Sequence, residues 1–121
     1  MLNLKMKNLT WLIPLVVLCS SNLPFAYASD DSVIAQGKEI AFDRKKGNCL
    51  ACHIMDDGEL AGVIGPPLVS MQARYPDKAK LRDQIWDATA RNPQTSMPPF
   101  GRHRMLTEEE IDKVVEYVNS L

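Results

Sequence analysis

The sequence is poor in the residues that most often build metal and catalytic sites, since its 121 residues include three cysteines and two histidines. Basic residues are not in excess either, because 14 Lys and Arg stand against 15 Asp and Glu. This balance argues against a nucleic-acid-binding protein. The sequence also lacks internal repeats, low-complexity tracts and any sign of a second domain. These absences leave a small single-domain protein.

The N-terminal segment is typical of a secretory signal peptide. Lys5 and Lys7 precede an apolar run over residues 9–18, and Ala26-Tyr27-Ala28 supplies the small residues that a signal peptidase reads. The sequence therefore predicts cleavage after Ala28 and a periplasmic protein. We expect no membrane anchor, because the apolar run is short and Pro14 lies near its centre.

A lipoprotein cleavage before Cys19 is the alternative for this segment. It is disfavoured because bulky Leu18 precedes the cysteine, where such sites carry a small residue. Cleavage of residues 1–28 leaves residues 29–121 as one domain, with a net charge of about −3 once two lysines are lost. Of the three cysteines, Cys49 and Cys52 remain in that domain.

The stretch Cys49-Leu50-Ala51-Cys52-His53 is the most informative part of the sequence. Two cysteines at this spacing can each add a thiol across a haem vinyl group, and the histidine that follows is then held at the iron. The motif predicts one haem c, bound covalently through Cys49 and Cys52, with His53 as an axial iron ligand. In so small a domain the haem would also form part of the core.

Three other uses of these cysteines are less consistent with the sequence. A thioredoxin-like redox pair needs a βαβ setting, but no alternating strand pattern surrounds the motif. A zinc site needs four ligands; the only other histidine is His103, and adjacent Cys52 and His53 suit one tetrahedral metal poorly. A structural disulfide between Cys49 and Cys52 is the third alternative.

Apolar residues at helical spacing predict an all-α domain with three main helices and long loops around the haem. The first helix is expected over residues 32–45 and the second over 77–90. The third is expected over 107–121, with a capping box formed by Thr107 and Glu110. Gly37 is either a tolerated surface glycine or a point of helix crossing. Several basic residues are expected on the solvated face of the second helix: Arg74, Lys78, Lys80 and Arg82.

Two proline-containing segments are candidates to complete the haem site. Gly65-Pro66 suits a stiff loop whose Pro66 carbonyl would accept a hydrogen bond from His53, although an ordinary turn is an alternative. Met97 lies in a loop stiffened by Pro98 and Pro99, which favours it as the second axial ligand.

Other residues could affect the opposite haem face. Phe100 is expected to pack on the haem. Ligation by His103, or an open site that would bind gases or peroxide, are the alternatives to ligation by Met97. Met71 and Met105 are expected to fill the core.

These segments together resemble class I cytochromes c, through the Cys-x-x-Cys-His motif, Gly65-Pro66-Pro67-Leu68, Met97-Pro98-Pro99-Phe100-Gly101 and the final amphipathic helix. More narrowly, residues 47–121 resemble the SoxX family of sulfur-oxidation cytochromes, notably in the stretches 83–93 and 101–104. One departure from class I cytochromes is the charged insertion at residues 44–48, which separates Phe42 from the haem motif.

The SoxX resemblance implies axial ligation by His53 and Met97 and a periplasmic partnership. SoxX proteins pair with a SoxA-type haem subunit in an L-cysteine S-thiosulfotransferase, which couples thiosulfate oxidatively to a cysteine of the carrier SoxYZ. The electrons leave through haem to a downstream cytochrome c or oxidase. No catalytic residue is expected in this chain, because the sulfur chemistry needs a thiol and both cysteines of the domain bind haem. A free-standing electron-shuttle cytochrome c is the alternative.

Overall fold

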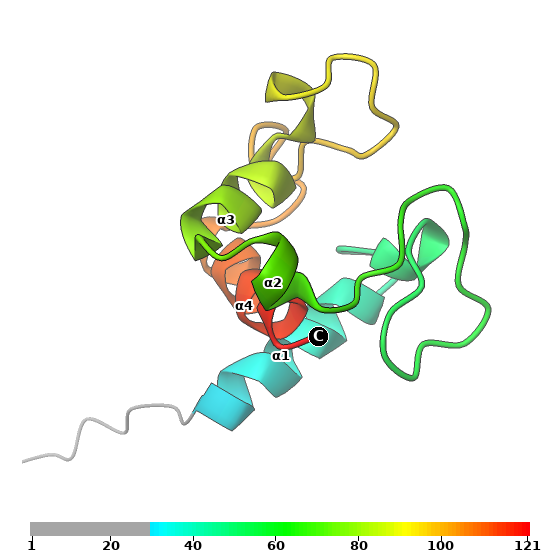
Figure 1. Cartoon of the computed structure of the whole chain (residues 1–121), viewed down its shortest axis with the longest axis vertical. Helices are drawn as coiled ribbons and strands as arrows, with labels where there is room; N and C mark the ends of the chain where they lie inside the picture. Colours follow the sequence, from blue (N-terminus) through cyan, green and yellow to red (C-terminus); the bar gives the residue numbers. More distant parts are fainter. Residues whose placement is uncertain (1–29) are drawn as a thin grey trace, which may run out of the picture.

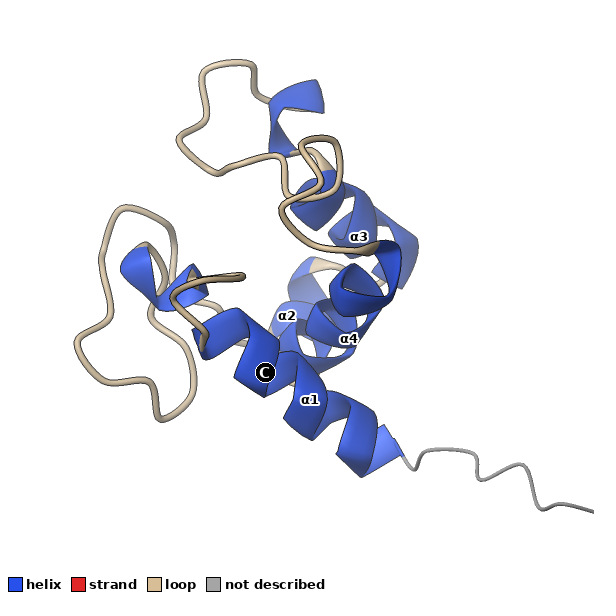
Figure 2. Ribbon diagram, turned by 180° about the vertical axis from the view of Figure 1, so that it is seen from behind, coloured by secondary structure: helices blue, strands red, loops and turns tan. Residues whose placement is uncertain are grey.

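The computed structural model describes residues 30–121, which fold into helices connected by loops and contain no β-strand (Figure 2). The predicted all-α class is therefore confirmed. The signal peptide and its cleavage site lie outside the described residues. Within residues 30–121, none of the helices is long and apolar enough to cross a membrane. The elements are α1 (Asp30–Phe42), η1 (Cys49–Ala51), α2 (Met71–Arg74), α3 (Lys78–Trp86), η2 (Ala88–Ala90) and α4 (Glu108–Asn119).

Helices α1 and α4 cross in the centre of the fold, and Gly37 lies at the crossing (Figure 1). A Cβ atom on Gly37 would lie 2.0 Å from the backbone oxygen of Lys113 and 2.9 Å from Cβ of Tyr117. No side chain fits in that space, so Gly37 is a crossing point rather than a surface glycine. The neighbouring ring of Phe42 meets Tyr117 edge to face, with centroids 6.0 Å apart.

The first helix ends at Phe42, so the prediction that it continues to Lys45 is wrong. Asp43 provides the physical reason, because its side chain accepts a hydrogen bond from the Lys45 N–H at 2.8 Å and its carbonyl accepts from the Lys46 N–H at 3.0 Å. These bonds replace the helical pattern with a tight turn. The Gly47 N–H then donates to the Ile40 carbonyl at 3.1 Å and returns the chain to α1.

The second predicted helix is interrupted at Asp87, so its expected extent over residues 77–90 is wrong. Asp77 caps α3 by accepting from the Ala79 N–H at 3.0 Å. At Asp87 the backbone turns to φ −151° and ψ 87°, and the carboxylate accepts from the Thr89 N–H, which starts η2. Asp87 thus ends one helix and caps the next. The sequence also gave no sign of α2, since one turn is too short to show a helical repeat.

Helix α4 is capped as predicted. The Thr107 hydroxyl accepts from the Glu110 N–H at 3.2 Å, and the Glu110 carboxylate accepts from the Thr107 N–H at 3.0 Å. One face of α4 is buried against α1 and α3 and forms the centre of the core. This face contains Ile111, Val114, Val115, Tyr117 and Val118.

Basic residues of α3 join it to α4 instead of simply facing solvent. Arg82 pairs with Glu108 and, through Nε, with Asp112 at 2.7 Å. Lys78 pairs with Glu116 at 2.8 Å. The expectation that these residues lie on a solvated face is therefore incomplete, because their charged groups bridge two helices.

Two loops extend to the same side of the helices (Figure 1). Residues 52–70 connect the cysteine motif to α2, and residues 91–106 connect η2 to α4. The first loop contains Pro66 and the second contains Met97. This arrangement brings the two candidate haem-binding segments together, although they are far apart in the sequence.

Candidate functional site

A cleft of about 680 Å³ is formed by these two loops and the helices behind them. This volume is within the range of small-molecule and cofactor sites. Its apolar floor comes from core residues of α3 and α4, among them Leu81, Ile85 and Val114. The structure places all six predicted site residues on its walls: Cys49, Cys52, His53, Pro66, Met97 and Phe100.

Cys49, Cys52 and His53 are presented by the short helical turn η1. Asn48 enters this turn with φ 46°, in the left-handed region that favours small polar residues and glycine. The N–H groups of Cys52 and His53 both donate to the Cys49 carbonyl, at 3.1 and 2.9 Å. Both sulfur-bearing side chains and the imidazole are therefore held by one tight turn on the cleft wall.

The two thiols are not arranged as a reactive redox pair. Both cysteines are free. Burial raises the pKa of the Cys49 thiol to about 11, whereas exchange-active cysteines have lowered pKa values. Among residues 30–121, no group of three or more His, Cys, Asp or Glu side chains could hold a metal ion, so a zinc site has no further ligands there.

His53 is oriented by the loop that follows it. Its Nδ1 atom lies 2.8 Å from the Pro66 carbonyl oxygen. A carbonyl only accepts, so Nδ1 carries the proton and donates, which leaves the Nε2 lone pair for a metal. A Cβ atom on Gly65 would lie 2.4 Å from Cε1 of His53, so the imidazole packs directly on the glycine backbone.

Arg74 supports this loop from behind, a role that the sequence reasoning missed. Its Nη1 donates to the Pro67 carbonyl at 2.7 Å and contacts the sulfur of Met71 at 3.3 Å. We expected Arg74 on the solvated face of the second helix, but it ends α2 and lines the cleft. All charged residues that line the cleft are basic: Arg44, Lys45, Lys46 and Arg74.

Met97 reaches the cleft from the second loop and is half-buried. Its N–H donates to the Thr95 hydroxyl at 3.2 Å.

Phe100 is buried in the core and also lines the cleft. His103 is exposed and is not among the lining residues. Of the two methionines expected to fill the core, Met71 is buried, but the expectation for Met105 is wrong because 46% of it is exposed.

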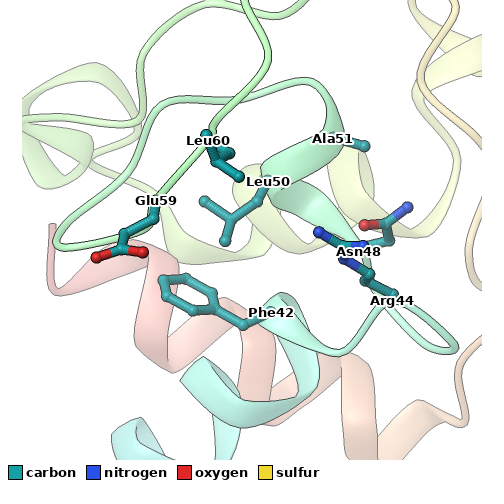
Figure 3. A pocket seen from close by; sticks show the side chains of 7 residues that line it. All are labelled: Phe42, Arg44, Asn48, Leu50, Ala51, Glu59 and Leu60. Carbon is teal, nitrogen blue, oxygen red and sulfur yellow. The ribbon is translucent and has the colours of Figure 1, made fainter.

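A second, smaller cavity of about 270 Å³ lies beside the cysteine motif. In Figure 3, Phe42, Leu50 and Leu60 face the same hollow, with Glu59 at one side. Phe42 therefore packs on Tyr117 and lines this small cavity. It does not line the large cleft. The turn at residues 43–47 accounts for this, because it separates Phe42 from the cysteines.

Comparison with known proteins identifies the type of domain. Residues 33–118, from α1 to α4, match the family described as cytochrome c oxidase, cbb3-type, subunit III. The chain belongs to this family. It is accordingly a c-type cytochrome domain, whose cofactor is haem and whose role is electron transfer.

An uncharacterized lipoprotein of Aquifex aeolicus (strain VF5) is 38% identical to this c-type cytochrome over 76 residues. The similar region covers 62% of this chain and 37% of the relative. The chain thus spans little more than a third of the length of that curated relative.

The residues of the cleft fit the haem that this cytochrome family implies. The donors on its walls are two thiols, one imidazole and the thioethers of Met71, Met97 and Met105, and the floor between them is apolar. The basic lining residues complement the two carboxylates of a haem. Cys49, Cys52, His53 and Met97 are the residues that would hold it, and haem supplies an iron that changes reversibly between the ferric and ferrous states.

Proposed function

We propose that this cytochrome carries a single haem c, joined to Cys49 and Cys52 by thioether bonds, with His53 and Met97 as axial iron ligands. The observation that carries the proposal is the gathering of these four side chains on the walls of one cleft. The hydrogen bond from His53 Nδ1 to Pro66 supports ligation through Nε2.

Ligation by histidine and methionine favours electron transfer. A thioether raises the reduction potential relative to a second histidine, because soft sulfur stabilises ferrous iron. Met97→Ala tests this assignment: it should remove the sulfur-to-iron charge-transfer band and lower the reduction potential, while covalent haem is retained. An unchanged ferric spectrum would instead indicate an open or differently ligated iron.

We infer that the chain serves as the electron-transfer subunit of a SoxAX-type L-cysteine S-thiosulfotransferase, in a complex with a SoxA-type haem subunit. Joining the outer sulfur of thiosulfate to a cysteine thiol of SoxYZ forms one S–S bond and releases two electrons and a proton. The step needs a thiol or persulfide nucleophile. Residues 30–121 contain two cysteines, both assigned to haem, so the sulfur chemistry belongs to the partner and this chain accepts electrons.

Copurification tests this partnership. An affinity-tagged chain, isolated from a sulfur-oxidising cell grown on thiosulfate, should retain a larger haem subunit through gel filtration. Elution of the chain alone under all ionic conditions would contradict a stable complex. The tagged chain should not retain SoxYZ through gel filtration, because the carrier would bind the sulfur site of the SoxA-type subunit rather than the haem cleft of this chain.

A free-standing electron-shuttle cytochrome is the second candidate, because a c-type cytochrome domain suits either function. The two functions differ in the effect of deleting the gene. Loss of a thiosulfotransferase subunit should abolish thiosulfate consumption and leave respiration on other donors intact. Loss of a respiratory shuttle should slow oxygen consumption on several donors.

We propose that the domain acts in the periplasm after export. Cleavage after Ala28 would release it, whereas the lipoprotein name of the Aquifex relative favours lipid attachment at Cys19. Intact-mass measurement of protein from native membranes and from periplasm distinguishes the two. A free N-terminus at Ser29 supports release, and a diacylglyceryl adduct on Cys19 supports anchoring.

A further inference from the structure

The loop that carries Met97 is shaped by local hydrogen bonds. The N–H groups of Arg91 and Asn92 donate to the Ala88 carbonyl at 3.3 and 3.1 Å, and the Thr95 N–H donates to the Asn92 carbonyl at 3.0 Å. The Met97 N–H donates to Thr95. These bonds give residues 91–97 a shape but do not tie them to α1 or α4. The position of the loop therefore depends on how its two ends are fixed.

Backbone contacts at Trp86 join those two ends. The Trp86 carbonyl accepts from the N–H groups of Gly101 and Arg102, at 3.0 and 3.4 Å. A Cβ atom on Gly101 would lie 2.0 Å from Cδ1 of Trp86, so the indole packs directly on the returning backbone. Trp86 is itself fixed to α4, because its Nε1 donates to Glu108 at 3.0 Å.

An ion pair closes the same junction. Nη1 of Arg102 lies 3.2 Å from Oδ2 of Asp87, whose side chain is 10% exposed against 51% for Arg102. The other carboxylate oxygen of Asp87 accepts from both the N–H and the hydroxyl of Thr89. Because both oxygens are engaged and the carboxylate is nearly buried, Asp87 presents a fixed anchor for the guanidinium.

We propose that Asp87 and Arg102 are positioning residues that clasp the base of the Met97 loop and thereby keep the Met97 thioether at the haem iron. This inference rests on the proposed ligation by Met97. With the ion pair removed, the junction keeps the two backbone bonds at Trp86, the contact of the indole with Gly101 and the burial of Phe100. The loop then opens more often, the thioether leaves the iron, and an external ligand can enter.

Imidazole binding to the ferric holoprotein measures this opening. The protein is matured with haem in cells, and imidazole association is followed by stopped-flow absorbance above pH 8, where imidazole is uncharged. An uncharged probe is needed, because removal of a positive side chain then leaves the electrostatic attraction between imidazole and the protein unchanged. The variants are R102Q, R102K and R104Q, with M97A as the fully open reference.

Arg104 supplies the matched control. Arg104 is exposed, lies two residues after Arg102 and carries the same charge. Its bond to this junction comes from the backbone, because its N–H donates to the Gly101 carbonyl at 2.9 Å. We expect R102Q to bind imidazole about tenfold faster than the wild type. Loss of the ion pair raises the fraction of protein with an open loop, and the association rate rises with that fraction. R102K should be intermediate, and R104Q should match the wild type.

Equal association rates for R102Q and R104Q would overturn the proposal. So would a faster rate in R102Q that is matched by an equivalent fall in its guanidinium unfolding midpoint, since that would indicate general loosening. If R102Q fails to retain haem, the comparison of R102K with R104Q decides. Slow imidazole binding by M97A would refute ligation by Met97 itself, whereas fast binding by M97A with wild-type rates in R102Q would refute only the clasp.

Discussion

The two loops that form the cleft are built differently. The loop after the cysteine motif is bonded back to that motif along its length: Gly62 and Gly65 donate to Leu50 and Cys52, and Leu68 donates to Ile54, at 2.7 to 2.8 Å. The Met97 loop has bonds within itself and fixed ends. We therefore expect the first side of the cleft to be the more rigid and the second to move about its base, although Met97 packs against the core.

This difference would give separate tasks to the two proposed haem ligands. His53 is locked between Gly65 and the Pro66 carbonyl, so with the proposed ligation the haem would be held firmly from this side. We expect the Met97 loop to release its ligand without unfolding of the helices. We expect changes in the first loop to affect haem retention, and changes in the second to affect ligation and potential.

The largest effect should follow from removing the sulfur atoms of the rigid side. Cys49→Ser together with Cys52→Ser should abolish covalent haem, because no thioether can form. Intact-mass spectrometry of protein made with the cytochrome maturation machinery measures this loss. The wild type should carry the mass of one haem; a wild-type mass equal to that of the bare chain would contradict covalent attachment altogether.

Gly65→Ala should break the packing that orients His53. The new Cβ would lie 2.4 Å from the imidazole, and such a clash in a packed site costs about 1–3 kcal/mol of unfolding free energy. Denaturant unfolding followed by haem absorbance measures it. Gly58→Ala is the milder control, since its Cβ would meet chiefly the end of the Leu50 side chain, which can move, with the Met55 carbonyl oxygen at 3.1 Å. Equal costs for the two variants would argue against a special role for the glycine beside His53.

Acid should release Met97 before it releases the haem. The Thr89 hydroxyl holds the pKa of Asp87 below its ordinary value, so the charged form stabilises the fold above the unfolded pKa. This contribution is lost as the pH falls through the lowered pKa that Asp87 has in the folded protein. Thr89→Val should raise the pKa of Asp87, so that the sulfur-to-iron band fades at a higher pH than in the wild type.

An acid titration of ferric protein measures both signals in one sample. The sulfur-to-iron band reports Met97, and the main haem band reports the cofactor in its cleft. The bond from His53 to the Pro66 carbonyl contains no carboxyl group, so Thr89→Val should leave the pH dependence of the main band unchanged. A parallel shift of both bands would mean that the two sides of the cleft are coupled.

The smallest effect should come from relaxing one proline in each loop. Pro98→Ala gives the mobile loop more freedom, and a proline-to-alanine change of this kind costs about 0.4–1 kcal/mol. Imidazole binding should become a few times faster. Pro66→Ala should have little effect on it, because the carbonyl that holds His53 remains and Arg74 still anchors its neighbour Pro67. Similar rate increases in both variants would remove the distinction between the loops.

The sequence predicted the parts of the fold that depend on local signals. The capping box at Thr107 and the apolar stripe of α4 lie within one segment, so the helix was predicted correctly. The ends of α1 and α3 were not, because Asp43 and Asp87 use their own side chains to redirect the backbone. Such competition between two local hydrogen-bond patterns is not visible in apolar periodicity.

The candidate site residues could be predicted from their residue types and spacing. The residues that hold them in place were missed, because their contacts join segments that are far apart in the sequence. The cysteine motif and Met97 stand out from residue type and spacing, and the structure places them in one cleft. Arg74 was expected on a solvated face and Arg102 was assigned no role, yet Arg74 donates to the Pro67 carbonyl and Arg102 pairs with Asp87. Only the three-dimensional arrangement shows which surface arginine has a carbonyl or carboxylate within reach.

The crossing of α1 and α4 at Gly37 also fixes an order of assembly. These helices lie on opposite sides of the cysteine motif in the chain, so their contact closes a loop that contains the motif. Until then the motif lies in an open polypeptide, where an attachment enzyme can reach both sulfur atoms. Late packing of this helix pair would therefore leave an interval in which the proposed haem could be attached before the domain finishes folding.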